Sequence, residues 1–598
     1  MSTAATPGKG LDLAVIGNSR IGALIDTGAS VVWMCVPRFD GDPVFCSLLD
    51  ADSRDGRFDI ELEQRTSIRQ HYVKNTAILR TEIEDARGGR IEVIDFAPRF
   101  YQHGRIFAPV SLVRIVRKLA GRPRIRVRFL PRSGYGEESP PVTFGTHHIR
   151  AAVPAYPLRL TTDAPITHVI EHSPMLIDDC YTFVIGPDET LQSSPSEAGR
   201  VMLEETQRYW RRWVRNLAVP FDWQEAVIRA AITLKLNTFD DTGAVIAALT
   251  TSVPEAPNTQ RNWDYRYCWL RDAYFVINAL NRLGATGSLE RYMRYIENII
   301  VDADPATLQP VYGLSGESRL TERQAGNLAG YEGMGPVRTG NQAWEQVQHD
   351  VYGAAILGVS HAFFDQRLDT VGDKALLQRL EPLGEQAYAR FMKPDAGIWE
   401  FRGRREVHTF SAVMCWAACD RLARIAERVD PERVLYWRER ANLIHAEICS
   451  SAWSAQLGGF ASTFGGHDAD ASLLVLGEIG FLRPDDSRLR ASVAAIERHL
   501  RRGHFLLRYD RPDDFGVPDT AFIVCTFWWI QALALLGERD RAVQEFERLL
   551  AARNRFGLLS EDIDVNSGRL WGNFPQTYSM VGIIMCAMRL SRRWEDAF

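Results

Sequence analysis

The sequence predicts a multidomain chain of 598 residues in which an N-terminal antiparallel β-sandwich is followed by an all-α (α/α)6 toroid. Three observations support this. Apolar residues alternate with period two up to about residue 190, the period becomes 3.6 beyond residue 220, and the second part divides into segments of similar length. We therefore predict a β-sandwich domain in residues 1–190, a linker helix in 191–219 and a catalytic barrel in 220–598.

The β-sandwich prediction rests on strand patterns that recur along the first third of the chain. Residues 124–129 alternate polar and apolar side chains, and residues 78–83 face residues 91–96 across the turn at Gly88-Gly89. Such alternation gives each sheet one polar and one apolar face. A long series of hairpins then buries its apolar faces by forming two packed sheets.

A linker helix is predicted to start after Ser194, because Ser194 is a good N-cap, Pro195 suits the first helical turn and Glu197 completes a capping box. It should run to about Trp213. Twelve further helices are predicted, over 222–238, 271–283, 286–301, 342–364, 374–391, 409–427, 431–450, 468–479, 487–501, 519–535, 538–552 and 578–592.

Twelve such helices form six αα-hairpins, which bury their inner faces by closing into a ring. The longest connections, around residues 302–341, 392–408, 502–518 and 553–577, all follow odd-numbered helices of this series. They should gather on one rim, where a functional site is expected.

Composition and charge exclude several classes of function. The chain has 70 Lys and Arg against 75 Asp and Glu, a net charge of −5, so a nucleic-acid partner is not expected. Apolar runs of 18 residues and an N-terminal secretory signal are both absent, which predicts a cytoplasmic protein without membrane contact. Nine scattered cysteines are typical of reduced, buried thiols. No cofactor or metal is predicted.

Two acidic residues stand out in the long loops, where aromatic and ionisable residues are interleaved in a composition that suits a sugar pocket. Glu400 and Glu561 each precede a predicted inner helix of the ring. Glycoside hydrolysis needs two carboxyls, one that donates a proton and one that is ionised. The pair is therefore the candidate catalytic machinery, although a single loop glutamate is often only a solvated charge.

Five motifs in order resemble glycoside hydrolase family 15, which contains glucoamylases, glucodextranases and bacterial trehalases. They occupy residues 261–273, 335–341, 397–400, 508–510 and 559–562, the last followed by 572–576. Residues 14–19 and 33–40 look like the opening of the bacterial members' β-domain, so the resemblance covers nearly the whole chain.

This resemblance implies an inverting, exo-acting α-glucoside hydrolase that releases β-glucose from the non-reducing end of its substrate. It implies Glu400 as general acid and Glu561 as general base. For substrate binding, the matching positions are Arg271, Asp272, Trp263, Trp399, Arg338 and Arg508.

Phe401 departs from the family pattern, because fungal glucoamylases have a second carboxylate directly after the general acid. The altered leaving-side subsite argues against long starch chains and leaves trehalose, isomaltose, maltose or another short α-glucoside open. The sequence also leaves open which glycosidic linkage is cleaved and whether the β-domain contributes to the site. The oligomeric state is open too, and a homo-oligomer is one option.

Two other functions remain as alternatives: an (α/α)6 disaccharide phosphorylase and a non-catalytic carbohydrate-binding protein. A phosphorylase would place a phosphate-binding cluster where Glu561 stands, and a binding protein would be expected to lack one glutamate.

His168 and His172 fit an inverted zinc-protease pattern, but a strand is predicted there, which would hold the two rings too far apart for one ion.

Overall fold

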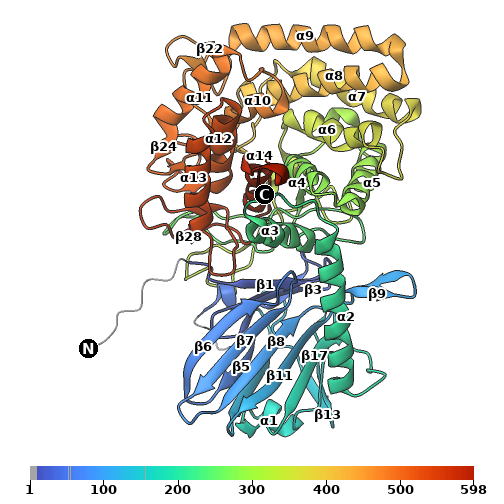
Figure 1. Ribbon diagram of the computed structural model, residues 1–598, viewed down its shortest axis with the longest axis vertical. Helices are drawn as coiled ribbons and strands as arrows, with labels where there is room; N and C mark the ends of the chain where they lie inside the picture. The colour runs from blue at the N-terminus through green and yellow to red at the C-terminus, as the bar shows by residue number, and fades with distance from the viewer. Residues whose placement is uncertain (1–9, 52, 54, 155, 598) are drawn as a thin grey trace.

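The computed structural model describes residues 10–597 except 52, 54 and 155. The N-terminal segment used to argue against a secretory signal, residues 1–9, thus lies outside the described residues. The molecule has a β-domain at one end and a helical domain at the other (Figure 1). Within the described ranges, every helix is too short or too polar to cross a membrane.

The β-domain is a sandwich of two antiparallel sheets, as the alternation predicted. In the described residues the first sheet has the order β1-β2-β3-β5-β12-β16, with β4 paired to β3, and the second has the order β13-β14-β15-β17-β11-β8-β7-β6. The first comprises β1 (Ala14–Gly17), β2 (Gly22–Ile25), β3 (Val31–Val36), β4 (Asp42–Phe45), β5 (Arg57–Leu62), β12 (Arg124–Leu130) and β16 (Met175–Leu176). The second comprises β6 (Arg65–Tyr72), β7 (Leu79–Asp85), β8 (Arg90–Phe96), β11 (Leu112–Ala120), β13 (Val142–Gly145), β14 (His148–Ala151), β15 (Leu158–Thr162) and β17 (Cys180–Pro187).

The predicted pairing across Gly88-Gly89 is confirmed, with Ile83 opposite Ile91 in the β7–β8 ladder. Phe58 of the first sheet meets Phe183 of the second with ring centroids 6.0 Å apart, so aromatic side chains fill the space between the sheets.

The strand predicted around His168 is wrong. Residues Ile166–Ile170 form a short helix, α1, which ends before His172, and His172 has a positive φ of 52°. The two imidazoles therefore do not share a helix face, and His168 Nδ1 lies 2.8 Å from Ser173 Oγ instead. We still do not expect these two histidines to bind zinc, but the reason is that α1 ends before His172.

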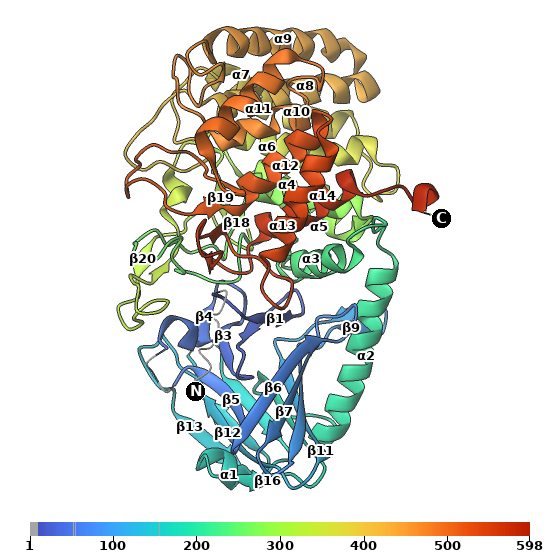
Figure 2. The ribbon, with the colours of Figure 1, turned by 60° about the vertical axis from the view of Figure 1, so that its left-hand side comes forward.

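The linker helix α2 (Pro195–Arg215) begins as predicted, because Ser194 accepts a hydrogen bond from the Glu197 amide. It runs along the second sheet and up to the helical domain (Figure 2). The helical domain then holds twelve α-helices in the described residues, α3 (Gln224–Leu236), α4 (Leu270–Arg282), α5 (Thr286–Asp302), α6 (Asp350–Phe364), α7 (Lys374–Arg390), α8 (Thr409–Val429), α9 (Val434–Ser451), α10 (Leu476–Ile479), α11 (Ser487–Leu500), α12 (Ile523–Leu535), α13 (Arg539–Ala551) and α14 (Thr577–Leu590).

The even-numbered helices from α4 to α14 form an inner ring, and the odd-numbered ones pack outside it. This is the predicted toroid. Two boundaries differ from the prediction by a full two turns, and the others by four residues or fewer. The helix expected over 342–364 starts at Asp350, because residues 342–345 form a 3-10 turn capped by the Asn341 side chain. The helix expected over 468–479 is mostly the 3-10 turn of residues 471–475, capped by Asp470.

Candidate active site

A cavity opens at one rim of the toroid. Its walls come from the segments that precede the inner helices: residues 261–272 before α4, 341–346 before α6, 398–402 before α8, 508–522 before α12 and 561–576 before α14. All its lining residues lie between positions 247 and 578. Both candidate glutamates are among them, so the structure brings together loops that the sequence placed on one rim.

Glu400 lies at the wall of this cavity and keeps about a quarter of its side chain exposed. Trp269 Nε1 donates a hydrogen bond to its Oε1 over 2.6 Å, and Arg271 Nη2 lies 3.6 Å from the same oxygen. Both contacts are made by Oε1. The backbone of Glu400 has a φ of +61°, a conformation that costs a non-glycine residue free energy and often occurs at functional sites.

Glu561 is almost completely buried, with 1% of its surface exposed. Burial, together with the nearby charges of Glu255 and Asp562, raises the pKa of Glu561 well above its ordinary value. The backbone amide of Asn573 donates to Oε2 over 3.4 Å. The Tyr265 hydroxyl lies close enough to lower the pKa of this carboxyl in part. Oε1 accepts no hydrogen bond from the described residues.

Glu255, Glu561 and Asp562 form a carboxylate cluster whose oxygens lie within 4.8 Å of one another. In the described part of the chain, it is the one group of acidic, histidine or cysteine side chains close enough to hold a metal ion. The cluster is balanced by Arg508, whose guanidinium forms two hydrogen bonds with Glu255, of 3.2 and 2.5 Å. Gly572 permits this packing, since a Cβ there would stand 2.6 Å from that of Glu561.

Arg271 and Asp272 lie side by side in the cavity wall at the start of α4. Arg271 Nε is 3.1 Å from Asp272 Oδ1, and Asp350 lies 3.8 Å from the same guanidinium. Burial raises the pKa of Asp272 to about 6, although Arg271 opposes the shift. A charged pair held this firmly can bind adjacent sugar hydroxyls, one group as donor and the other as acceptor.

Aromatic residues form much of the remaining wall. Trp399 donates its indole N–H to Asp470 over 2.9 Å, and its ring contacts Tyr509, Phe522 and Trp528. Trp263 packs edge-on against Phe515, with ring centroids 5.6 Å apart. These rings offer flat apolar faces to the C–H face of a sugar.

Phe401 occupies the position of the missing second carboxylate. It lines the cavity but is 4% exposed, stacks on His408 and contacts Tyr509. The group beside Glu400 is therefore an apolar surface that makes no hydrogen bond to a sugar.

Of the three arginines carried over from the resemblance, Arg271 and Arg508 line the cavity but Arg338 does not. Arg338 donates to Asn262 over 3.2 Å and to Glu322 over 2.9 Å, so its guanidinium is held behind the wall. Arg338 is therefore not among the residues that line this cavity, and its role in substrate binding stays a prediction. Asn341, three residues further along the same segment, does line the cavity.

Sequence reasoning missed several residues that the structure places at the carboxylates. Tyr265 and Trp269 lie in the same motif as Trp263 and contact Glu561 and Glu400, respectively. They follow Trp263 by two and six residues, and in an extended segment residues at even spacing point to the same side. This spacing could have identified them from the sequence. Glu255 carried no such signal, because its proximity to Glu561 arises only from folding.

The arrangement suits acid–base chemistry. One carboxyl is partly exposed and held by N–H donors, whereas the other is buried among carboxylates, so the two occupy different electrostatic environments within one cavity. General acid–base catalysis uses two carboxyls in different environments, although the raised pKa of Glu561 by itself favours its protonated form over the ionised form that a base needs.

Comparisons with known proteins agree with this chemistry. The family model described as "Glycosyl hydrolases family 15" matches residues 222–588, and the model "Trehalase-like, N-terminal" matches residues 6–174. A trehalase from Mycobacterium tuberculosis is 32% identical, the match covering 98% of this chain and 90% of that protein. A trehalase from Thermoplasma volcanium is 29% identical over 96% of this chain and 92% of its own length.

Among solved structures, the chain is similar to a bacterial glucoamylase crystallised with acarbose. The TM-score is 0.68 at 14% sequence identity, covering 99% of this chain and 96% of the other. At this identity the likeness shows the fold: an N-terminal sheet domain followed by a helical toroid.

Proposed function

The chain belongs to glycoside hydrolase family 15, and on this premise we propose that it is an inverting, exo-acting α-glucoside hydrolase whose substrate is a short α-glucoside, trehalose first among them. The observation that carries this proposal is the presence of Glu400 and Glu561 in one cavity, in different electrostatic environments. We also propose the domain division 1–190, 191–219 and 220–598, with catalysis in the last part.

In the proposed mechanism, Glu400 donates a proton to the glycosidic oxygen. Its Oε1 is engaged by Trp269 and Arg271, so the proton resides on Oε2. Glu561 receives a proton from the attacking water through Oε1, the oxygen without a protein donor. The water adds to the anomeric carbon on the face opposite the leaving group, and the configuration at that carbon is inverted.

The two carboxyls are held by neighbouring aromatic residues. Trp269 holds Glu400 and Tyr265 holds Glu561, and the two rings lie edge to face with centroids 5.4 Å apart. The two carboxyls are thus held by different side chains. The proposed inverting mechanism requires them to stand roughly 6.5–9.5 Å apart with room for a water, whereas a retaining mechanism needs them closer.

The terminal glucose is proposed to bind where Arg271 and Asp272 meet, against Trp399. We propose an exo-acting site because Trp528 and Tyr578, which also line the cavity, are buried side chains of the inner helices α12 and α14. Trp263 and Phe515 then flank the leaving group nearer the opening.

The preference for a short substrate rests on Phe401 and on the relatives. Phe401 supplies no hydrogen bond to a leaving sugar, which disfavours a subsite adapted to starch. Trehalases from bacteria and archaea match this chain over 95–98% of its length. The two alternatives, a phosphorylase and a binding protein, are less favoured because both carboxyls are present in the cavity.

The test is the rate and stereochemistry of glucose release. Trehalose, maltose, isomaltose, kojibiose, nigerose and soluble starch are compared with and without phosphate, and the first product is observed by proton NMR before mutarotation. We expect trehalose to be the best substrate, starch to be poorer than at least one disaccharide and β-glucose to appear first. Early α-glucose would contradict the role of Glu561 as base, and a phosphate requirement with glucose phosphate as product would favour a phosphorylase.

A further inference from the structure

The wall segment from Trp263 to Trp269 has two faces. Trp263, Tyr265 and Trp269 line the cavity, and Tyr265 and Trp269 contact the two catalytic glutamates. Asp264 and Arg266 alternate with them and do not line it. Because Asp264 bridges to Thr251 in an extended backbone, successive side chains point to opposite sides. The far face of this segment is turned toward the β-domain.

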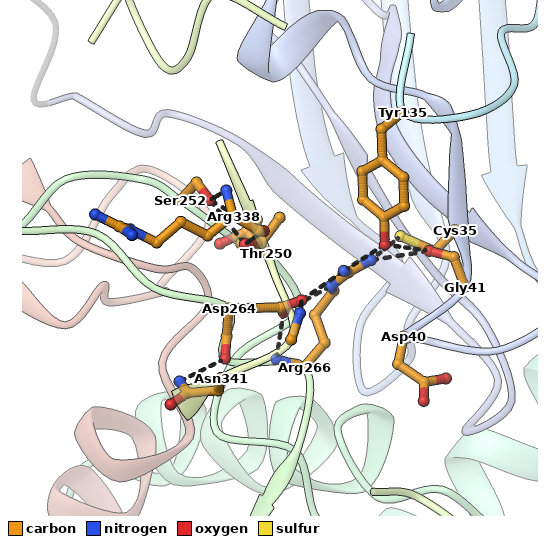
Figure 3. Close-up of polar contacts among 12 residues, drawn as sticks. Cys35, Asp40, Gly41, Tyr135, Thr250, Ser252, Asp264, Arg266, Arg338 and Asn341 are labelled. Carbon is orange, nitrogen blue, oxygen red and sulfur yellow. Dashed lines mark hydrogen bonds and ion pairs between the residues drawn. The ribbon is translucent and has the colours of Figure 1, made fainter. Parts of the chain in front are cut away.

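Arg266 is completely buried, and all five of its N–H groups have an acceptor. Nε and one Nη2 hydrogen go to Asp264, at 2.8 and 2.7 Å. The other three reach the β-domain: the Tyr135 hydroxyl at 2.8 Å, the Gly41 carbonyl at 2.9 Å and Cys35 Sγ at 3.4 Å (Figure 3). A guanidinium with every donor engaged has its orientation fixed by both domains at once.

Asp264 also holds a second segment of the cavity wall, residues 340–341. Its Oδ2 accepts a hydrogen bond from the Gly340 amide over 3.2 Å, and its carbonyl accepts one from Asn341 Nδ2 over 3.1 Å (Figure 3). Asn341 lines the cavity. A Cβ at Gly340 would lie 2.1 Å from the Thr321 carbonyl, so this loop is closely packed where it meets Asp264.

On the β-domain side, Tyr135 is held in an unusual backbone conformation. Gly134, Tyr135 and Gly136 all have positive φ, of 59°, 54° and 81°. Asp42 stabilises the turn by accepting hydrogen bonds from the amides of Gly134 and Tyr135, at 2.7 and 2.9 Å. Positive φ is unfavourable for a tyrosine, and such residues persist where the surrounding structure imposes them. Here the turn directs the phenol at Arg266.

We propose that Arg266 and Tyr135 are positioning residues of the active site, through which the β-domain holds the Trp263–Trp269 segment so that Tyr265 meets Glu561 and Trp269 meets Glu400. The β-domain thus contributes to catalysis without any residue in the cavity. This inference rests on the proposed α-glucoside hydrolase activity for its kinetic test, but its structural test is independent of that activity.

The experiment uses the full-length chain with Tyr135→Phe and Arg266→Lys. Each variant is assayed for kcat and KM on the α-glucoside that the wild type hydrolyses fastest, for thermal midpoint, and for hydrogen exchange of the amides in residues 261–269. We expect kcat/KM to fall about tenfold in Tyr135→Phe and about 100-fold in Arg266→Lys, mostly through kcat, because misplaced catalytic supports act in the transition state. Exchange in 261–269 should accelerate in both.

Tyr72→Phe is the matched control. Tyr72 also belongs to the β-domain and touches the toroid, with Arg229 3.5 Å above its ring, and its hydroxyl bonds to the backbone of Val15. Its ring also packs edge-on against Phe556, and neither Arg229 nor Phe556 lines the cavity. The control should lower the thermal midpoint comparably and leave kcat/KM within twofold.

The proposal is overturned if Tyr135→Phe and Arg266→Lys behave like Tyr72→Phe in kcat/KM, or if exchange in 261–269 is unchanged in both. Should Arg266→Lys fail to fold, Tyr135→Phe decides. Should the wild type hydrolyse no α-glucoside, the proposed function fails, and the exchange measurement alone decides the positioning role.

Discussion

Replacing Glu561 by glutamine should make the protein more stable and less active at the same time. The substitution preserves the shape of a side chain that is 1% exposed and keeps an oxygen for the Asn573 amide. It removes one carboxylate from a cluster whose oxygens lie within 4.8 Å of one another. Two unit charges at this separation repel by about 3 kcal/mol at an effective dielectric constant of about 20.

The pH dependence fixes the sign of the stability change. Burial raises the pKa of Glu561 above the value of 4.5 that it has when exposed, so the folded state binds more protons than the unfolded chain. The stability of the wild type therefore falls as pH rises from about 4.5 toward the folded pKa. Glu561→Gln avoids this loss, and its gain should be absent near pH 4 and present at pH 7.5.

We expect a gain of about 1–3 kcal/mol at pH 7.5, part of the full repulsion, because the three carboxyls share protons. For a chain of this size, that raises the melting temperature by about 1–3 °C. The activity should fall by about 100-fold or more, as for the loss of a positioned base.

The assay is calorimetric unfolding at both pH values, together with kcat. Glu545→Gln is the control: Glu545 is equally buried but pairs with Arg548 at 2.9 Å, so its removal should not stabilise and should leave kcat unchanged. A Glu561→Gln variant that melts below the wild type at pH 7.5, or that retains near-normal turnover, would refute this reasoning.

Three further predictions concern the same cavity. Glu400→Gln should lower kcat by about 100-fold or more with the fold intact, and near-normal turnover would remove Glu400 as the acid. Asp272→Ala should lower kcat/KM by about 100-fold for every α-glucoside, because it removes hydrogen bonds to a charged acceptor; a loss confined to one substrate would place Asp272 in the leaving-side subsite instead. The kcat/KM of the wild type should fall as pH is lowered through about 6, since protonation of Asp272 removes that acceptor, and a profile that stays flat down to pH 5 would contradict this.

The sequence alone predicted the fold class well, because the relevant signals are local. The alternation in residues 78–96 predicted a hairpin that the structure contains, and the 3.6-residue period predicted twelve helices near their observed positions in the described chain. Errors arose where side chains cap the backbone. Asn341 and Asp470 each stabilise a 3-10 turn in a stretch whose apolar pattern indicated an α-helix.

From the sequence, the site residues could be predicted only where they lie in recognisable motifs. Residues 261–273 and 397–400 drew attention to Trp263, Arg271, Asp272 and Glu400, which the structure places in one cavity. Arg338 looked equivalent, but Glu322 and Asn262 hold its guanidinium behind the wall. Nothing in the spacing of these residues along the chain could reveal that pairing.

The sequence by itself thus determined most of the strands and helices and the loops that line the cavity, since periodicity and composition depend on neighbouring residues. The tertiary structure alone decided which groups meet: Glu255 with Glu561, and Tyr135 with Arg266, 131 positions away. The physical reason is that burial and electrostatic interaction depend on distance in space. A carboxylate acquires a raised pKa, and an arginine an orientation, only when chain closure removes water and brings distant residues within a few ångströms.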